Sequence, residues 1–328
     1  HTRSDRDWSS DVCSSDLVDH LTVRFPNKKA KKGEPKVITA VEDISFVLYE
    51  DEMIGIVGES GCGKTTLSRG ILSLIPTSEG RVVLEGEDTK ILGRRAVSDR
   101  IQMIFQNPLS SFHPLYTIWD SLLEVAKVHR IPKKQAKKDL ETLFSYVGLT
   151  YDLAKKYPSQ LSGGQLQRFA ICRALLLKPK VLIADEVVSA LDVSIQRDII
   201  QLLLYLRQKL HIAILFISHD LNLVEHICDN TAVMYLGTVV EKGPTKELFR
   251  NPKHPYTKLL FSSKTKTDPD EISKKRDVFE DIPNILEVPA GCKFQNRCPE
   301  FKKGICDQKR PTFVQVEGDH YVTCLRSA

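Results

Sequence analysis

One glycine-rich stretch restricts the fold of this chain more than any other feature. Residues 58–65 read GESGCGKT and fit the pattern G-x-x-x-x-G-K-[ST]. The stretch follows a short apolar run, Met53–Val57, and precedes a helical pattern over Thr65–Leu74. A buried strand that enters a glycine-rich loop and leaves it as a helix is the setting in which this pattern binds phosphate groups. The sequence therefore predicts an α/β core with a phosphate-binding loop.

Each position of this loop has an expected role. Glycines allow backbone N–H groups to curl around phosphate oxygens, and the helix N-terminus adds a favourable partial charge. The Lys64 ammonium is expected to reach the terminal phosphates, and the Thr65 hydroxyl is expected to ligate Mg²⁺. Cys62 is interpreted as a small filler and not as a nucleophile. The residues predicted to form the nucleotide site are Gly58, Glu59, Ser60, Gly61, Cys62, Gly63, Lys64, Thr65 and Thr66.

A pair of carboxylates follows a later apolar strand. Val181–Ala184 is followed directly by Asp185 and Glu186. This puts both acids at the carboxyl end of a strand, where doubly wound sheets bind ligands. Asp185 is expected to hold Mg²⁺, and Glu186 is expected to polarise the attacking water as general base. Taken alone the pair is a weak signal, because strand ends often carry acids.

Strand patterns alternate with helical ones along most of the chain. Such alternation predicts a doubly wound, mostly parallel sheet. An antiparallel β subdomain is expected ahead of the phosphate-binding loop, from Val18–Phe25 and Val37–Leu48. Residues 115–178 are interpreted as a helical subdomain. The remaining strands are expected at Ile101–Phe105, Val181–Ala184, Ile212–Ile217 and within Thr231–Val240.

Both ends of the chain differ in composition from the middle. Asp7–Leu17 reads DWSSDVCSSDL, the translation of a common sequencing-library adaptor, so residues 1–17 are expected to lie outside the fold, with a genuine polar tail as the alternative. Gly243-Pro244 is expected to break the chain. Beyond about Asn251 the composition shifts toward Lys, Pro and Cys. The sequence thus predicts a nucleotide-binding domain over residues 18–250 and a C-terminal extension over residues 251–328.

A second glycine motif identifies the superfamily that the chain resembles. Leu161, Ser162, Gly163, Gly164 and Gln165 read LSGGQ at the start of a helical pattern over Leu166–Leu177, and this resembles the signature of ABC-type P-loop ATPases. The resemblance implies that this motif binds the γ-phosphate of ATP held by an opposing subunit. It extends to Gln106 as the Q-loop residue, to Ser189–Asp192 as the D-loop with Asp192, and to His219 as the switch histidine.

The residue that stacks on adenine is the least defined part of this resemblance. Phe25 is the candidate, although the loop after it lengthens the usual separation from the phosphate-binding loop. Phe46 is the rival, and it is equally plausible as a core residue.

Longer stretches narrow the resemblance to one family. GESGCGKTT, VSALDVSIQ, MYLG and HPYT are similar to the oligopeptide/dipeptide importer ATPases, and most closely to the F-type subunit of their D/F pair. The resemblance implies ATP and Mg²⁺, a heterodimer with a second ABC ATPase subunit, two membrane permeases and, indirectly, an extracytoplasmic solute-binding protein. One departure is Val187, where the family usually has proline after the catalytic glutamate, and this loss is expected to loosen the D-loop.

Two other functions compete with an importer ATPase. A non-transport ABC ATPase, acting in a nucleic-acid-handling or enzyme complex, would usually carry a coiled-coil insertion or two ATPase domains, and neither pattern occurs in this sequence. A degenerate module without hydrolysis is disfavoured by Glu186 and His219. The net charge of +5 is too slight to indicate a nucleic-acid partner. With no apolar run long enough for a membrane span, a cytoplasmic protein held on the inner face of the membrane by its permeases is expected.

Four of the eight cysteines cluster near the C-terminus. Cys292, Cys298, Cys306 and Cys324 have the spacing C-x5-C-x7-C-x17-C. Thiols gathered in a cytosolic protein suggest a metal site, and four cysteines admit either Zn²⁺ or an iron–sulfur cluster. The resemblance to the importer family implies a [4Fe–4S] cluster, in a structural or regulatory role. Free reduced thiols are the alternative.

Overall fold

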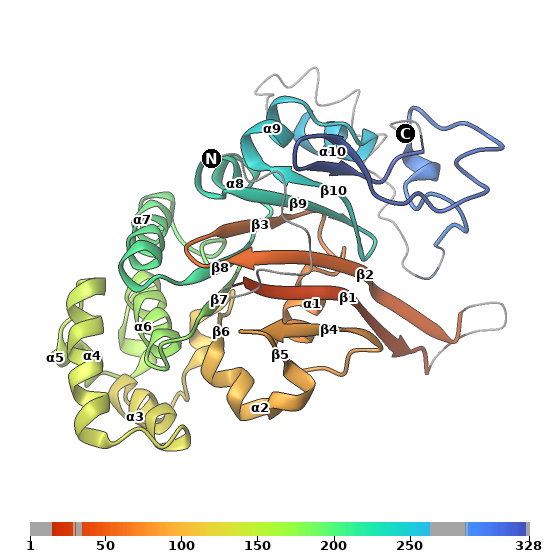
Figure 1. The fold of residues 1–328 in the computed structure, drawn as a ribbon. Coiled ribbons are helices and arrows are strands. Elements are labelled where there is room, and N and C mark those ends of the chain that lie inside the picture. The colour runs from red at the N-terminus through yellow and green to blue at the C-terminus, as the bar shows by residue number, and fades with distance from the viewer. Residues whose placement is uncertain (1–14, 29, 31–34, 263–285, 287, 326–328) are drawn as a thin grey trace. The chain divides into compact units, whose positions relative to one another are not determined.

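The computed structural model describes residues 15–28, 30, 35–262, 286 and 288–325. The chain divides into two compact units. The P-loop unit comprises residues 1–47, 54–86 and 218–328, and the signature unit comprises residues 48–53 and 87–217. Each unit combines strands with helices (Figure 1).

An antiparallel β layer opens the P-loop unit. Its strands β1 (Ser15–Pro26), β2 (Val37–Tyr49) and β4 (Glu79–Leu84) lie in the order β2-β1-β4. β1 begins at Ser15, so residues 15–17 lie inside the fold, contrary to the expectation for the leader. Strand pairing explains this difference, because the antiparallel ladder between β1 and β4 already begins at Leu17, which lies opposite Val83. The rest of the leader, residues 1–14, lies outside the described residues.

The second sheet of the P-loop unit has the order β11-β12-β10-β9-β3. β3 (Met53–Val57) is parallel to β9 (Asn230–Tyr235), with Ile54 opposite Asn230. β10 (Thr238–Pro244) runs antiparallel to β9, β12 (His320–Val322) pairs with the other edge of β10, and β11 (Val314–Glu317) pairs with β12. The C-terminal extension therefore continues the sheet that contains the strand leading into the phosphate-binding loop.

Gly243 and Pro244 do not break the chain as expected. They are the last two residues of β10, opposite Thr231 and Asn230. Gly243 lets β12 approach closely, since a Cβ added there would lie 3.0 Å from the His320 Cα. Pro244 occupies the strand end, where its missing N–H interrupts no central hydrogen bond.

A buried side-chain hydrogen bond fastens β12 to β10. The His320 Nε2 atom lies 2.7 Å from Glu241 Oε1, and the Glu241 side chain is fully buried. The same carboxylate accepts hydrogen bonds from the backbone N–H groups of Lys253 at 2.7 Å and His254 at 2.9 Å. One buried acid thus organises both the last strand and the segment that leads into α10.

The helices of the P-loop unit are short. α1 begins at Lys64, the penultimate residue of the glycine-rich pattern, and ends at Ile71, three residues before the predicted end, since Ser73 has a positive φ of 55°. The other helical segments are α8 (Leu221–Ile227), α9 (Thr245–Arg250), α10 (Pro255–Ser262) and the 3₁₀ turn η3 (Gln295–Arg297).

The signature unit contains three parallel strands in the order β8-β7-β6. β6 (Ile101–Ile104) pairs with β7 (Val181–Asp185), and β7 pairs with β8 (Ala213–Ile217). β7 and β8 are completely buried, as their apolar runs predict. β8 starts one residue later than expected, because the preceding helix ends with His211 in the left-handed conformation.

Between β6 and β7 the chain is helical, over the region interpreted as a helical subdomain. Its helices are joined by aromatic contacts, in which Trp119 meets Tyr151 edge-on at 4.7 Å between ring centroids and the buried Phe144 meets the buried Phe169 at 5.4 Å. The signature unit also has the short strand β5 (Glu87–Asp88), and its helical segments are α2 (Thr89–Arg100), η1 (Pro108–Ser111), α3 (Ile118–Val128), α4 (Lys133–Val147), α5 (Tyr151–Ala154), η2 (Pro158–Gln160), α6 (Gly163–Leu175) and α7 (Val193–Leu210).

Among the described residues, none of the helices combines the length and apolar character needed to cross a membrane.

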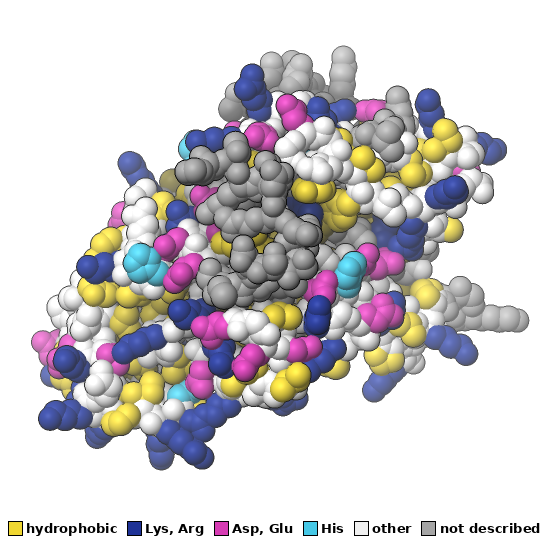
Figure 2. Space-filling view, in the orientation of Figure 1, with side chains coloured by type: hydrophobic (Ala, Val, Ile, Leu, Met, Phe, Trp, Pro, Cys, Tyr) yellow, Lys and Arg dark blue, Asp and Glu magenta, His cyan; other side chains and the backbone are white. Residues whose placement is uncertain are grey.

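Acidic side chains are interspersed with lysine and arginine on the face drawn in Figure 2.

Candidate functional site

The phosphate-binding loop joins β3 to α1 within the P-loop unit. Its glycines Gly58, Gly61 and Gly63 have φ values of 155°, 78° and 107°, so the last two occupy the left-handed region that side chains rarely adopt. At Gly63 the limit is also steric, because an added Cβ would collide with the Ala40 carbonyl oxygen. The loop is therefore held tightly curled, as a cradle of backbone N–H groups requires.

Lys64 closes this loop from within. Its Nζ atom donates hydrogen bonds to the carbonyl oxygens of Gly58 at 2.8 Å and Glu59 at 3.0 Å. The residue is only 6% exposed. The ammonium therefore lies among the residues that would surround the phosphates. The Cys62 side chain is also buried beside it, and this burial raises the pKa of the thiol. A raised pKa disfavours the reactive thiolate, and this agrees with the expectation that Cys62 is a small filler in the loop.

The two carboxylates lie at the carboxyl end of β7 in the signature unit. Asp185 is the last residue of the strand and is 5% exposed. Glu186 has a φ of 49°, a left-handed conformation that costs a non-glycine residue about 1–3 kcal/mol and clusters at active sites. Its backbone is held by a hydrogen bond from its N–H to the Ile217 carbonyl at 2.9 Å. Val187, at the usual proline position, is 1% exposed.

Gln106 and Glu186 are brought together in this unit. The Gln106 Nε2 donates to Glu186 Oε2 at 2.9 Å and lies 3.4 Å from the Ser189 Oγ. The contact follows from topology, because β6 and β7 are parallel neighbours and both deliver their next residues to the same edge. The Q-loop and carboxylate predictions therefore converge on one cluster.

The signature motif forms the N-terminus of α6. Ser162 is the N-cap and accepts a hydrogen bond from the Gln165 N–H at 3.3 Å, while the Gln165 Oε1 accepts from the Ser162 N–H at 3.1 Å. This capping box fixes the first turn of a 13-residue helix whose start favours anions. The helix begins at Gly163, three residues earlier than predicted. Gly164 is buried, and a Cβ there would lie 2.8 Å from the Ile195 Cγ2.

The remaining predicted residues lie in separate places. Asp192 is the exposed N-cap residue of α7 in the signature unit. His219 is exposed and follows β8, in the P-loop unit. Phe25 is 37% exposed near the end of β1, whereas its rival Phe46 is 9% exposed and belongs to the core. Exposure leaves Phe25 as the candidate for stacking.

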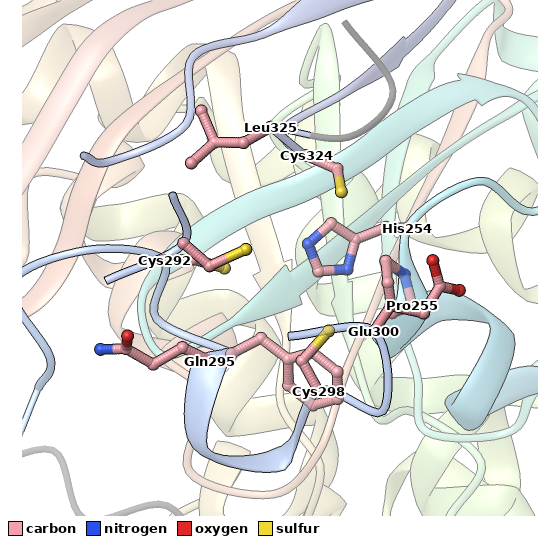
Figure 3. Close-up of a pocket in the computed structure, with 10 residues that line it drawn as sticks. His254, Pro255, Cys292, Gln295, Cys298, Glu300, Cys324 and Leu325 are labelled. Atoms are coloured by element: carbon pink, nitrogen blue, oxygen red, sulfur yellow. The ribbon is translucent and has the colours of Figure 1, made fainter. Parts of the chain in front are cut away.

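The four C-terminal cysteines line one pocket of the P-loop unit. Its wall also contains His254, Phe294 and Glu300. The sulfur atoms of Cys292, Cys298 and Cys324 point into the pocket (Figure 3). All four are free thiols, and burial raises the pKa of Cys298 to about 11. Within the described part of the chain, however, no group of three or more His, Cys, Asp or Glu side chains is placed to hold a metal ion.

The strand–loop–helix cradle, the acidic strand end and the capped glycine motif together define an ABC-type ATPase. Two family models match the chain. The model described as "ABC transporter" matches residues 41–189, and the model described as "Oligopeptide/dipeptide transporter, C-terminal region" matches residues 240–306.

Curated relatives match along nearly the whole chain. The oligopeptide transport ATP-binding protein OppF of Haemophilus influenzae is 40% identical over 94% of this chain and 96% of its own length. The OppF protein of Escherichia coli is 41% identical over 93% and 94%, and the oligopeptide transport ATP-binding protein AppF of Bacillus subtilis is 40% identical over 94% and 95%. The chain therefore belongs to the OppF-type family of ABC transporter ATP-binding proteins.

Solved structures support the same fold. The dimeric ATP-binding cassette MJ0796, in a post-hydrolysis state bound to ADP and Pi, aligns with a TM-score of 0.61 at 26% identity, covering 70% of this chain and 99% of that one. The cbiO1 protein of Clostridium perfringens aligns with a TM-score of 0.62. The chain is thus an ATPase of the ABC class, and this activity uses ATP and Mg²⁺.

Proposed function

We propose that this chain hydrolyses ATP to energise an importer of oligopeptides, dipeptides or related solutes. The observation that carries the proposal is the presence of the ABC transporter match together with the oligopeptide/dipeptide C-terminal match in one chain. The OppF relatives are oligopeptide transport proteins by name, and they share nearly the full length of this chain.

Each predicted residue has a role in this proposal. The loop Gly58–Thr66 binds the phosphates, and Phe25 stacks on adenine. Thr65, Gln106 and Asp185 hold Mg²⁺, while Glu186 takes a proton from the attacking water and His219 contacts the γ-phosphate. The hydrogen bond between Gln106 and Glu186 supports a common role for these two residues, because it ties the Mg²⁺-sensing amide to the general base.

The signature residues Leu161–Gln165 and the D-loop Asp192 serve ATP held by an opposing ATPase subunit. The proposed assembly is a heterodimer with a D-type subunit under two permeases on the inner face of the membrane, fed by an extracytoplasmic solute-binding protein. The capped, anion-favouring start of α6 supports this role, since a helix N-terminus of this kind binds phosphate well.

A shared site predicts that the isolated chain hydrolyses ATP slowly. Turnover per chain should rise with protein concentration, because each site needs a second signature motif. It should rise further when the D-type subunit, the permeases and peptide-loaded binding protein are added in proteoliposomes, which should also take up peptide. Phosphate release measures ATP turnover, and labelled peptide measures uptake into the proteoliposomes. Full, concentration-independent turnover by the isolated chain would refute the shared site, and stimulation by nucleic acid but not by peptide would favour the non-transport alternative.

The proposal includes a [4Fe–4S] cluster held by Cys292, Cys298, Cys306 and Cys324. The kind of donor, and not the placement of the four side chains, supports such a cluster, because cysteine thiolates are its usual ligands and four free thiols line one pocket. Zn²⁺ is the second candidate for the same four sulfur donors. Bound there, the group would cross-link three segments of the C-terminal extension, which supports a structural or regulatory role and not a role in ATP chemistry.

Anaerobic purification tests this part of the proposal. The protein should be brown with visible charge-transfer absorption, and Cys298→Ser should lose the colour. Cys228→Ser, which changes a cysteine outside the pocket, should keep it. Colourless protein with stoichiometric zinc would refute the cluster in favour of zinc, and protein with neither metal would leave reduced thiols.

A further inference from the structure

Glu59, the second residue of the phosphate-binding loop, is bound by an arginine from the C-terminal extension. The Arg297 Nη1 donates to Glu59 Oε2 at 2.9 Å, and the Nη2 donates to Glu59 Oε1 at 2.9 Å. This is the two-pronged geometry that makes arginine–carboxylate pairs strong and directional. The pair is sheltered, with side-chain exposures of 7% for Arg297 and 22% for Glu59. The interaction joins residues 238 positions apart in the sequence.

Aromatic rings hold both partners in place. The Tyr256 hydroxyl accepts a hydrogen bond from the Glu59 backbone N–H at 3.1 Å. Tyr256 packs against Tyr235 at 4.6 Å between ring centroids, and Phe294 packs against Tyr235 at 5.3 Å. The Arg297 guanidinium lies 5.8 Å from the Tyr235 ring centroid. The Arg297 side chain is therefore held in place by its neighbours, so little side-chain conformational entropy is lost when it pairs with Glu59.

The same segment has a second attachment beside the loop. Lys293 Nζ lies 2.7 Å from Glu42 Oε2 and donates to the Leu236 carbonyl oxygen at 2.6 Å. Gly237, the next residue, donates through its N–H to the Cys62 carbonyl oxygen at 2.8 Å. The C-terminal extension thus has two attachments here: Arg297 binds the loop residue Glu59, and Lys293 binds the carbonyl oxygen of Leu236, whose neighbour Gly237 bonds the loop.

The charge of Glu59 makes its partner matter for ATP. A carboxylate in a loop that binds a polyphosphate repels the ligand unless a cation compensates it, and an uncompensated sheltered charge is costly. Lys64 bonds the Glu59 carbonyl oxygen, but this ammonium is also the group expected to turn to the phosphates. Once Lys64 turns away, Arg297 and Tyr256 remain to hold Glu59.

We propose that Arg297 is a positioning residue for ATP binding, through which the C-terminal extension sets the nucleotide affinity of the phosphate-binding loop. Arg297 neutralises Glu59, fixes its carboxylate away from the phosphates and keeps the loop in the shape that ATP requires. The proposal depends neither on the transported solute nor on a metal in the cysteine pocket.

Equilibrium binding of a fluorescent ATP analogue to the full-length chain tests the proposal. Arg297→Gln should weaken binding about tenfold, in the range usual for coupling between sites. Arg297→Lys, which keeps the charge without the fork, should show a smaller loss. The matched control is Lys303→Gln, because Lys303 is an exposed cation of the same extension; its affinity should stay within about twofold, well below that coupling range.

The double variant separates charge compensation from packing. Glu59→Gln together with Arg297→Gln should recover most of the lost affinity, because no charge is then left unpaired. Glu59→Gln alone also breaks the pair, but it removes the carboxylate that repels phosphate, so it should lose less affinity than Arg297→Gln, and this comparison with the double variant separates the two effects. Unchanged affinity in Arg297→Gln, no recovery in the double variant or a loss in Glu59→Gln as large as that in Arg297→Gln would each overturn the proposal.

Discussion

Replacing Glu186 with Gln should lower ATP turnover by about 10²–10⁴-fold, the usual contribution of a general base. Glutamine keeps the shape and the contact with Gln106, which lies 2.9 Å from the carboxylate, but it cannot take a proton from water. The loop that binds the phosphates belongs to the other unit, so ATP should still bind. Single-turnover phosphate release and nucleotide binding, measured on the assembled complex, separate the two effects.

The control for Glu186→Gln is Glu141→Gln, which makes the same change at an exposed position of α4 in the same unit. It should leave turnover within about twofold, as surface substitutions away from special features usually do. If Glu186→Gln kept most of the parental turnover, the general base would have to be another group. A large loss of ATP affinity would indicate instead that Glu186 supports the nucleotide site structurally.

The parts of the fold that the sequence predicts well are those governed by local pattern. β3 has the predicted bounds, since five apolar residues followed by a glycine-rich loop leave little freedom. The proximity of Gln106 and Glu186 can also be derived from the sequence, because each residue follows an apolar strand and parallel neighbouring strands end at one edge of the sheet. These features depend on chain direction and periodicity, both of which are readable in a sequence.

Features that depend on distant segments were not predictable in the same way. Gly243 and Pro244 look like a chain break, and only the approach of β12 explains a strand there. The contact of Arg297 with Glu59 has no local signal, because arginine in a loop is usually solvated. The HPYT stretch was identified as a family mark, but its tyrosine, Tyr256, gave no sign that its hydroxyl meets a loop N–H. Such contacts depend on tertiary register, which pattern alone does not encode.

Replacing Lys64 with Ala should weaken ATP binding by about 10- to 100-fold, because a hydrogen bond to a charged group contributes about 1.5–3 kcal/mol and each 1.4 kcal/mol is a factor of ten. Lys64 is the loop's own cation, and it bonds the carbonyl oxygens of Gly58 and Glu59 at 2.8 and 3.0 Å. Its loss removes both the phosphate contact and these internal bonds. Isothermal titration with ATP and Mg²⁺ measures the affinity.

Lys64→Ala can lose ATP affinity in two ways: through the lost phosphate contact, or through a change in loop shape once the internal bonds of Lys64 are gone. A measurement of the unfolding midpoint distinguishes them. Lys246→Ala removes an exposed lysine from α9 in the same unit and should change neither affinity nor stability appreciably. If Lys64→Ala loses affinity while its unfolding midpoint stays near that of Lys246→Ala, the ammonium acts on the phosphates directly. If the midpoint also falls, the carbonyl oxygens left without a donor have opened the loop, and part of the loss belongs to its shape. Unchanged ATP affinity in Lys64→Ala would contradict the assignment of residues 58–65 as the phosphate cradle, because Lys64 is the residue of this loop that is expected to reach the terminal phosphates.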